Sequence, residues 1–282
     1  MGKVHDAFEK AKKDKGLKII EPVKQQPDQH ARTEFAVLKK ALDPNSQDSN
    51  RALLDPTLVT YHNPTSVEAE IFKILRTNIL FPQVGQPPRS IMVTSAIPGD
   101  GKSFVASNLA ISIAQGIEEY VLLLDCDMRR STIHQRFGFN DRVSGLSDHL
   151  SKGKPLPTLL KKTVVDKLTI LPGGPTPANP SELLSSQAMR LLLKETKSRY
   201  SDRYIIVDSP PPQLTAETTA LANYIDGIII VVKYGSTPRK MVKDLADKFG
   251  KEKVIGVVFN GYRVPATERY GYGRYNRYGK KY

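Results

Sequence analysis

The sequence predicts a three-layer α/β domain with a mostly parallel central sheet. From residue 90 onward, six short aliphatic runs alternate with stretches of helical periodicity. The runs are continuously apolar, as expected for strands that helices cover on both faces. A glycine-rich motif follows the first run directly and precedes a helical stretch. These three observations favour an open α/β sheet that carries its site along one edge.

Composition bounds the class of protein further. A chain of 282 residues with 39% hydrophobic residues allows one sizeable domain plus appendages. The formal net charge of +13 favours anionic partners such as nucleic acid, anionic lipid or phosphorylated protein. Cys126 is the single cysteine, which excludes an intrachain disulfide and indicates a reducing compartment. No apolar run approaches the roughly 18 residues of a membrane span, and the amino terminus lacks the apolar region of a signal peptide.

Three regions are expected along the chain. Residues 1–60 are polar, contain scattered prolines and are expected to form an arm or linker with one or two helices. Residues 61–261 form the predicted α/β domain, and residues 262–282 form a tail rich in tyrosine. The tail is rich in glycine and charge and has no large aliphatic residue after Val264, so it is expected to be disordered.

The elements of the domain are predicted from apolar periodicity. A helix at 65–80 has Thr65 or Ser66 as its N-cap and an apolar stripe at helical spacing. Strands are predicted at 90–95, 120–125, 167–171, 204–208, 227–233 and 254–260. Further helices are predicted at 102–116, 131–137, 145–151, 182–199, 215–223 and 237–249.

The glycine-rich motif is a P-loop, with the sequence AIPGDGKS at 96–103 between a strand and a helix. Gly99 and Gly101 let backbone N–H groups turn toward phosphate oxygens, and the helix N-terminus adds partial positive charge. Lys102 is expected to reach the β- and γ-phosphates, and the Ser103 hydroxyl to ligate Mg²⁺. This predicts a P-loop NTPase fold that binds ATP. The expected nucleotide contacts are Pro98, Gly99, Asp100, Gly101, Lys102, Ser103 and Phe104.

Two further strands end in aspartates. The run VLLLDCD places Asp125 and Asp127 at the end of one strand, and IIVD places Asp208 at the end of another. Carboxyl ends of parallel strands share one edge, so these carboxylates are expected beside the polyphosphate. A divalent cation between the like charges removes the repulsion, which predicts Mg²⁺ at the site. Asp208 is the better metal-site candidate, which leaves Asp125 or Asp127 to accept a proton from an attacking hydroxyl.

These motifs together resemble the bacterial tyrosine kinases (BY-kinases) of polysaccharide export, of the CapB, CpsD and Wzc type. The resemblance covers about residues 60–262 and the tail. It is carried by the P-loop, LLLDCDMR and IIVDSPP, and by GLSDHL at 145–150, LPGGPTPANPSELLSS at 171–186 and GIIIVVKYGSTPRK at 227–240.

The resemblance implies roles for individual residues. Lys102 and Ser103 bind phosphate and Mg²⁺, Asp125 is the base for the tyrosine hydroxyl, and Asp127 and Asp208 complete the metal shell. A motif for oligomerisation lies in the helix at 65–80. Its residues here are Glu70, Lys73 and Arg76, with Lys73 where the family usually has arginine. That exchange keeps the charge but loses the bidentate fork.

The tail fits this interpretation as the enzyme's own substrate. Residues 262–282 hold six of the twelve tyrosines, of which Tyr262 is the least expected phosphate acceptor because it lies nearest the domain. The expected acceptors are Tyr270, Tyr272, Tyr275, Tyr278 and Tyr282.

The leading hypothesis is therefore an ATP- and Mg²⁺-dependent autokinase whose tail enters a neighbouring subunit's site and whose activity regulates exopolysaccharide synthesis and export. The resemblance also implies a separate transmembrane activator that regulates polysaccharide length and holds the cytoplasmic kinase at the inner face of the plasma membrane. A MinD/ParA-type positioning ATPase is the alternative, but its signature lysine is absent at Ile97. Arg–Tyr–Gly tails can also bind nucleic acid, although the kinase-type motifs make that partner unexpected.

Overall fold

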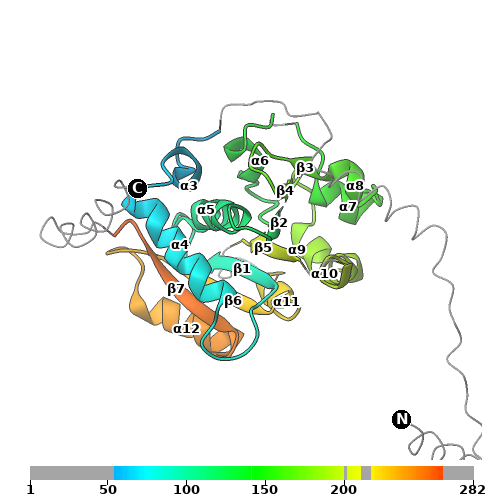
Figure 1. Ribbon diagram of the computed structural model, residues 1–282. Helices are drawn as coiled ribbons and strands as arrows, with labels where there is room; N and C mark the ends of the chain where they lie inside the picture. Colours follow the sequence, from blue (N-terminus) through cyan, green and yellow to red (C-terminus); the bar gives the residue numbers. More distant parts are fainter. Residues whose placement is uncertain (1–53, 141, 200–201, 211–216, 263–282) are drawn as a thin grey trace, which may run out of the picture. The chain divides into compact units, whose positions relative to one another are not determined.

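The computed structural model describes residues 54–140, 142–199, 202–210 and 217–262, and these form one seven-stranded sheet with helices on both faces (Figure 1). The strand order is β3-β4-β2-β5-β1-β6-β7, and all neighbours are parallel except β3 and β4. The predicted three-layer P-loop NTPase fold is confirmed. The arm up to residue 53 and the tail from residue 263, with its five expected phosphate acceptors, lie outside the described residues.

All six predicted strands are present. Their bounds are β1 Ser90–Ser95, β2 Tyr120–Asp125, β4 Leu168–Leu171, β5 Arg203–Asp208, β6 Gly227–Lys233 and β7 Val254–Asn260. A further strand, β3 Lys161–Lys162, is too short for a periodic pattern to reveal. The expectation that helices cover every strand on both faces is wrong for the edge strand β7, where Ile255, Val257 and Phe259 are exposed.

The predicted helices are present in the predicted order, with one correction. The single helix expected at 182–199 is two helices, α9 Pro180–Leu184 and α10 Gln187–Arg199. The break comes at Ser185 and Ser186, because the Ser186 hydroxyl accepts a hydrogen bond from the Met189 amide and so caps a new helix. The other helices are α3 Val59–His62, α4 Val67–Leu80, α5 Lys102–Ala114, α6 Ile133–Arg136, α7 Leu146–Lys152, α8 Leu156–Leu159, α11 Glu217–Ala222 and α12 Arg239–Phe249.

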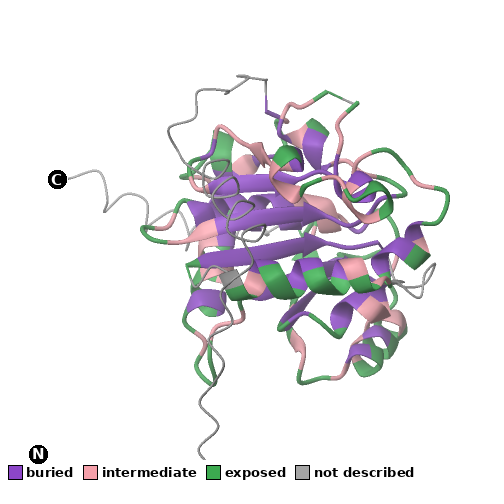
Figure 2. Cartoon of the chain, turned by 90° about the vertical axis from the view of Figure 1, so that its right-hand side faces the viewer, coloured by how far each residue is buried: buried purple, intermediate pink, exposed green. Residues whose placement is uncertain are grey.

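Two apolar layers, one on each face of the sheet, hold the helices to it (Figure 2). Successive residues of a strand point to opposite faces, so in β1 Ile91 and Val93 join one layer and Met92 joins the other. The first layer packs α4 and α5 against the sheet, and the second packs α9, α10 and α12. Because these layers cover both faces of the central strands, a ligand can reach the sheet where those strands end.

The packed domain extends back to Leu54, before the expected boundary at residue 61. Leu54 and Leu58 are buried in the first apolar layer. The buried Asn108 of α5 accepts a hydrogen bond from the Thr60 amide and donates one to the Thr57 carbonyl. Side-chain hydrogen bonds of this kind replace the regular pairing that a four-residue helix cannot supply, and sequence periodicity does not reveal them. Among the described residues, no helix is long and apolar enough to cross a membrane.

Candidate nucleotide and phosphoryl-transfer site

Three neighbouring strands deliver the predicted site residues to one edge of the sheet. The strands β2, β5 and β1 lie side by side, and Asp208 at the end of β5 pairs in register with Asp125 of β2 and Val93 of β1. The P-loop follows β1 directly. The structure therefore brings the P-loop and the aspartates together, as the motif positions predict.

The P-loop has the backbone conformation that its glycines allow. Gly99 has φ 88° and Gly101 has φ 96°, both in the left-handed region that favours glycine. A side chain at Gly101 would also meet the amide of Asn260, 2.0 Å from the added carbon. Ala96, where the usual pattern has glycine, is buried and is not among the described residues with positive φ, so its methyl group is accommodated. Helix α5 then begins at Lys102 with its N-terminal amides at the loop.

Two residues that the sequence did not single out brace the loop. The Thr237 hydroxyl donates to Asp100 Oδ1 at 2.7 Å, and Asn260 Nδ2 donates to the Asp100 carbonyl at 2.8 Å. Thr237 follows β6 and Asn260 ends β7, at the same edge as the P-loop. Their positions at strand ends were the available signal, since ligand sites of open α/β sheets collect there.

Lys102 and Asp127 form a mostly buried ion pair, with 3.0 Å between Nζ and Oδ2. Strand β2 ends at Asp125, so Asp127 lies in the following loop rather than at the end of the strand as expected. The carboxylate of Asp127 therefore balances the charge of the P-loop lysine. An incoming phosphate group would compete with Asp127 for the same ammonium group.

Asp125 is fully buried, and only one of its two carboxylate oxygens accepts hydrogen bonds. Its Oδ2 accepts hydrogen bonds from Ser131 Oγ at 2.7 Å and from the amides of Thr132 and Ile133 at 3.1 Å. Its Oδ1 has no hydrogen-bond partner. Burial, and then repulsion from Asp208, raise the pKa of Asp125 to about 8, although the Ser131 and Ile133 bonds favour the charged form. Ser131 is a further site residue that the sequence analysis did not identify.

Asp208 is buried with both carboxylate oxygens lacking a hydrogen bond of normal geometry. Burial raises its pKa to about 6, while the charge of Lys102 and the nearby Ser103 hydroxyl limit the rise. Ser103 is thus close enough to act on the carboxylate without bonding to it in good geometry. Two orphaned oxygens in one buried carboxylate call for a compensating cation.

These groups fit a divalent cation held together with a polyphosphate. No cluster of three or more acidic, histidine or cysteine side chains among the described residues could hold a metal by itself. Asp208 and the Ser103 hydroxyl offer hard oxygen ligands, and phosphate oxygens and water supply the rest in sites that bind Mg²⁺. The expected third ligand, Asp127, is engaged by Lys102 in this conformation.

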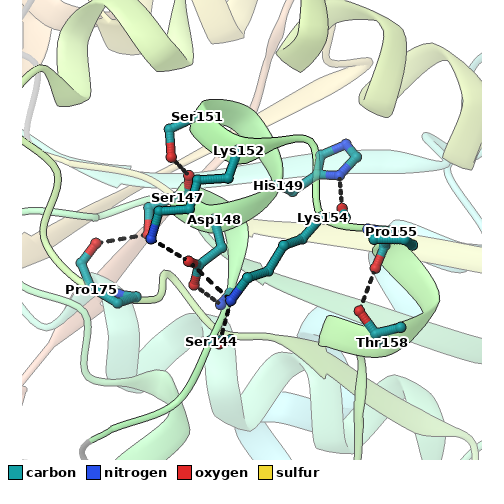
Figure 3. A network of polar contacts seen from close by, with 11 residues as sticks. Ser144, Ser147, Asp148, His149, Ser151, Lys152, Lys154, Pro155, Thr158 and Pro175 are labelled. Atoms are coloured by element: carbon teal, nitrogen blue, oxygen red, sulfur yellow. Dashed lines mark hydrogen bonds and ion pairs between the residues drawn. The ribbon is translucent and has the colours of Figure 1, made fainter.

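A polar network surrounds α7 (Figure 3) and positions the loop after β4, in which Gly173 lies near Asp125. The amides of Leu146 and Ser147 donate to the carbonyls of Pro172 and Gly173, and the Ser147 hydroxyl donates to the Pro175 carbonyl at 2.7 Å. A side chain at Gly173 would meet Ser131 Oγ at 2.8 Å. The loop after β4 therefore packs directly against the residue that holds Asp125.

The buried Asp148 holds this network together. Its Oδ1 lies 3.0 Å from Lys152 Nζ and 3.3 Å from Lys154 Nζ, and its Oδ2 accepts from the Gly145 amide (Figure 3). Burial acts to raise the pKa of Asp148, but these bonds outweigh burial and lower it.

The residues expected to mediate oligomerisation have partners within their own subunit. Glu70 and Lys73 pair along α4 with 3.0 Å between Oε2 and Nζ. Arg76 Nη1 donates to the Ser112 carbonyl of α5 at 2.8 Å. Arg76 thus fastens α4 to α5, whereas Glu70 and Lys73 stay at the surface.

Comparison with known proteins agrees with this geometry. The ParA family model, described as NUBPL iron-transfer P-loop NTPase, matches residues 87–267. The tyrosine-protein kinase YwqD of Bacillus subtilis is 35% identical over 217 residues, which cover 76% of this chain and 90% of that protein. CpsD of Streptococcus agalactiae is 30% identical over 75% of this chain and 90% of its own length. The chain matches only 30% of the length of Wzc of Salmonella typhimurium, at 32% identity.

Solved structures show the same relationship. The kinase domain of the Escherichia coli tyrosine kinase ETK matches with a TM-score of 0.70 and 28% identity, over 78% of this chain and 86% of that one. The chimerical protein CapA2B2 matches with a TM-score of 0.67 and 30% identity, over 76% and 93%. The septum site-determining protein MinD of Pyrococcus horikoshii, with a TM-score of 0.53 and 20% identity, shares the fold alone. The chain belongs to the family of bacterial tyrosine-protein kinases, within the ParA-type P-loop NTPases.

Proposed function

We propose that this kinase transfers the γ-phosphoryl group of ATP, bound with Mg²⁺, to tyrosines in the tail of a neighbouring copy. The observation that carries the proposal is the meeting of Lys102, Asp127, Asp125 and Asp208 at the ends of three adjacent strands, in a chain that covers 90% of a tyrosine-protein kinase. The proposed acceptors are Tyr270, Tyr272, Tyr275, Tyr278 and Tyr282.

The proposed roles follow from charge and position. The P-loop amides and Lys102 hold the phosphates, with Lys102 leaving Asp127 for the more highly charged ligand. Ser103, Asp208 and, once released, Asp127 are the proposed metal ligands. When bound, Mg²⁺ neutralises charge on the phosphate oxygens. Phosphoryl transfer needs little more than such positioning and charge stabilisation.

Asp125 is the proposed base that accepts the tyrosine proton. Hydrogen bonds from Ser131 and the α6 amides fix its orientation and favour its charged form. Because Asp125 is 0% exposed, a tyrosine hydroxyl reaches it only after the site opens. Separation of Lys102 from Asp127 on nucleotide binding is the proposed opening step.

In the cell, the proposed role is control of exopolysaccharide or capsule synthesis and export. We propose that a separate transmembrane protein activates the kinase and keeps it at the inner face of the plasma membrane. Resemblance to proteins named CpsD, CapB and EpsB supports this assignment. The tail of 21 residues carries six Arg or Lys and one Glu, so phosphates at roughly −1.5 to −2 each would reverse its charge and weaken subunit contacts.

Incubation with γ-labelled ATP and Mg²⁺, followed by peptide mapping, tests the proposed reaction. We expect label on the tyrosines at 270–282, and loss of at least about 100-fold in Lys102→Met, because the P-loop lysine contacts the transferred group. Lys243→Met, at an exposed position of α12, is the matched control and should keep full activity. ATP hydrolysis without phosphotyrosine would instead support a positioning ATPase of the MinD type.

A second comparison separates the two candidate bases. Asp125→Asn should lower kcat by about 100-fold or more with little change in KM for ATP, since general-base catalysis contributes about 10²–10⁴-fold. Asp127→Asn should act mainly on the affinity for Mg²⁺. The opposite pattern would assign the base to Asp127.

A further inference from the structure

A groove lies between α10 and the turn that joins α11 to β6, at the opposite edge of the sheet from the P-loop. Its volume is about 630 Å³, within the range of about 300–1,000 Å³ that ligand sites occupy. Asp226, which precedes β6, receives a hydrogen bond from the amide of Ser90, the first residue of β1. The groove is thus at the strand starts, whereas the nucleotide site is at the strand ends. Its lining residues are Arg190, Leu191, Lys194, Lys197, Ser198, Asn223 and Tyr224.

The groove is strongly cationic. Arg190, Lys194 and Lys197 lie on successive turns of α10 and all line it. Within the described part of the chain, neither Arg190 nor Lys194 forms an ion pair. Lys197 pairs with Asp226, but that carboxylate also accepts three hydrogen bonds from residues 89 and 90. One carboxylate therefore faces three cations, which favours an anionic ligand.

The walls of the groove suggest which anion. Leu191 and Tyr224 are 51% and 37% exposed and present apolar surface beside the cations. Ser198 and Asn223 add hydrogen-bonding groups. An aromatic ring that carries a phosphate matches this combination, because the ring packs on the apolar wall while Arg and Lys bind the dianion. A membrane surface matches it less well, since the apolar side chains line a recess.

We propose that this groove binds phosphotyrosine of the C-terminal segment 263–282, supplied by the same or a second copy of the chain. The proposal rests on the proposed autokinase function, which generates the ligand. From Tyr262, the 20 remaining residues can extend up to about 66 Å, several times the length of a strand in this sheet. The unphosphorylated segment is positively charged and is repelled by the groove, so binding would follow phosphorylation.

Fluorescence anisotropy with synthetic peptides tests the proposal without relying on kinase activity. Full-length Lys102→Met protein, which carries no phosphate of its own making, is titrated into labelled 263–282 peptides. We expect the peptide with phosphotyrosine at the five acceptors to bind at least about 10-fold more tightly than the unmodified peptide and than one with phosphoserine at the same positions. Equal affinity for the phosphotyrosine and phosphoserine peptides would overturn the proposal.

Charge-reversed variants locate the site. Arg190→Glu combined with Lys194→Glu should weaken phosphopeptide binding at least about 10-fold. Lys243→Glu with Lys248→Glu on the exposed face of α12 makes the same charge change and should leave binding unchanged. Equal losses in both double variants, with melting temperatures unchanged, would overturn the assignment to the groove. The assignment would also be overturned if the groove double variant no longer sediments with phosphatidylglycerol vesicles but still binds the phosphopeptide with unchanged affinity. Peptide binding in a protein that fails the ATP-labelling assay would remove only the proposed source of the ligand.

Discussion

The three carboxylates of the site differ in their partners, and these differences determine how readily each carboxylate ionises. Asp127 neutralises Lys102, Asp125 is bound by a hydroxyl and two amides, and Asp208 has no hydrogen bond of normal geometry. Asp125 and Asp208 lack an ion pair, and the pKa of each is raised. A buried carboxyl without a counter-ion resists ionisation, so the proposed nucleotide and Mg²⁺ would complete the site electrostatically.

The pH dependence of stability should reveal the burial of Asp125. Its pKa is raised from 3.8 to about 8, so the folded state keeps a proton that the unfolded state loses. The contribution of Asp125 to the free energy of unfolding is fully present below about pH 4 and is lost as the pH rises toward 8. In the presence of a chelator, Asp125→Asn should therefore stabilise the protein at pH 8 by roughly 1 kcal/mol or more, a rise of about 2–4 °C in Tm, and much less at pH 4.

Calorimetric melting at the two pH values checks this prediction. Asp244→Asn, which removes an exposed carboxylate from α12, should show no such pH-dependent gain. A uniform destabilisation by Asp125→Asn at both pH values would mean that Asp125 is charged in the folded protein.

Ser131 should act on the reaction by positioning Asp125. Removal of its hydroxyl in Ser131→Ala deletes the 2.7 Å bond to Oδ2, and bonds to charged groups contribute about 1.5–3 kcal/mol. We expect kcat to fall by about 10-fold or more, KM for ATP to stay constant, and the rise of rate with pH to shift to higher pH. Ser131→Thr should restore most of the rate; a rate unchanged in Ser131→Ala would exclude the role.

At the scale of helices and loops, the site depends on contacts between segments far apart in sequence. Helix α7 holds the loop after β4 against Ser131. Thr237, in the loop after β6, and Asn260, at the end of β7, brace the P-loop. The strands and the P-loop could be predicted because apolar runs and glycine spacing are local signals. These braces could not, because each depends on which loops the sheet order brings together.

The α7 network should be a stabilising element whose strength depends on pH. Asp148→Asn removes the charge that Lys152 and Lys154 share, and a loss of about 1–3 kcal/mol in the free energy of unfolding is expected at pH 7. Since the pKa of Asp148 is lowered in the folded state, its contribution is present above the unfolded pKa of 3.8 and disappears as pH falls through the folded pKa. Denaturant unfolding of the wild-type protein and of Asp148→Asn, at pH 7 and below pH 3, measures the loss of stability and its dependence on pH. A loss of the same size at both pH values would contradict an electrostatic role.

For the whole molecule, the sequence predicted the fold class, the succession of the main strands and helices along the chain, and the family. Local patterns carried that information, since each of the six predicted strands is a single apolar run and each site motif is contiguous. The sequence did not predict the division of 182–199 into two helices or the exposed face of β7. A serine cap and a position at the edge of the sheet depend on tertiary context. The use of Glu70, Lys73 and Arg76 between subunits stays a prediction, since their described contacts lie within one chain.

The central claim is transfer of phosphate between copies of this chain, and a mixing experiment tests it most directly. One partner keeps the active site but has phenylalanine at positions 270, 272, 275, 278 and 282; the other has Lys102→Met and an intact tail. With γ-labelled ATP, we predict phosphotyrosine on the Lys102→Met partner, with an initial rate that rises with the concentration of the active partner. Label absent from that partner, while the wild-type chain labels its own tail, would contradict transfer in trans.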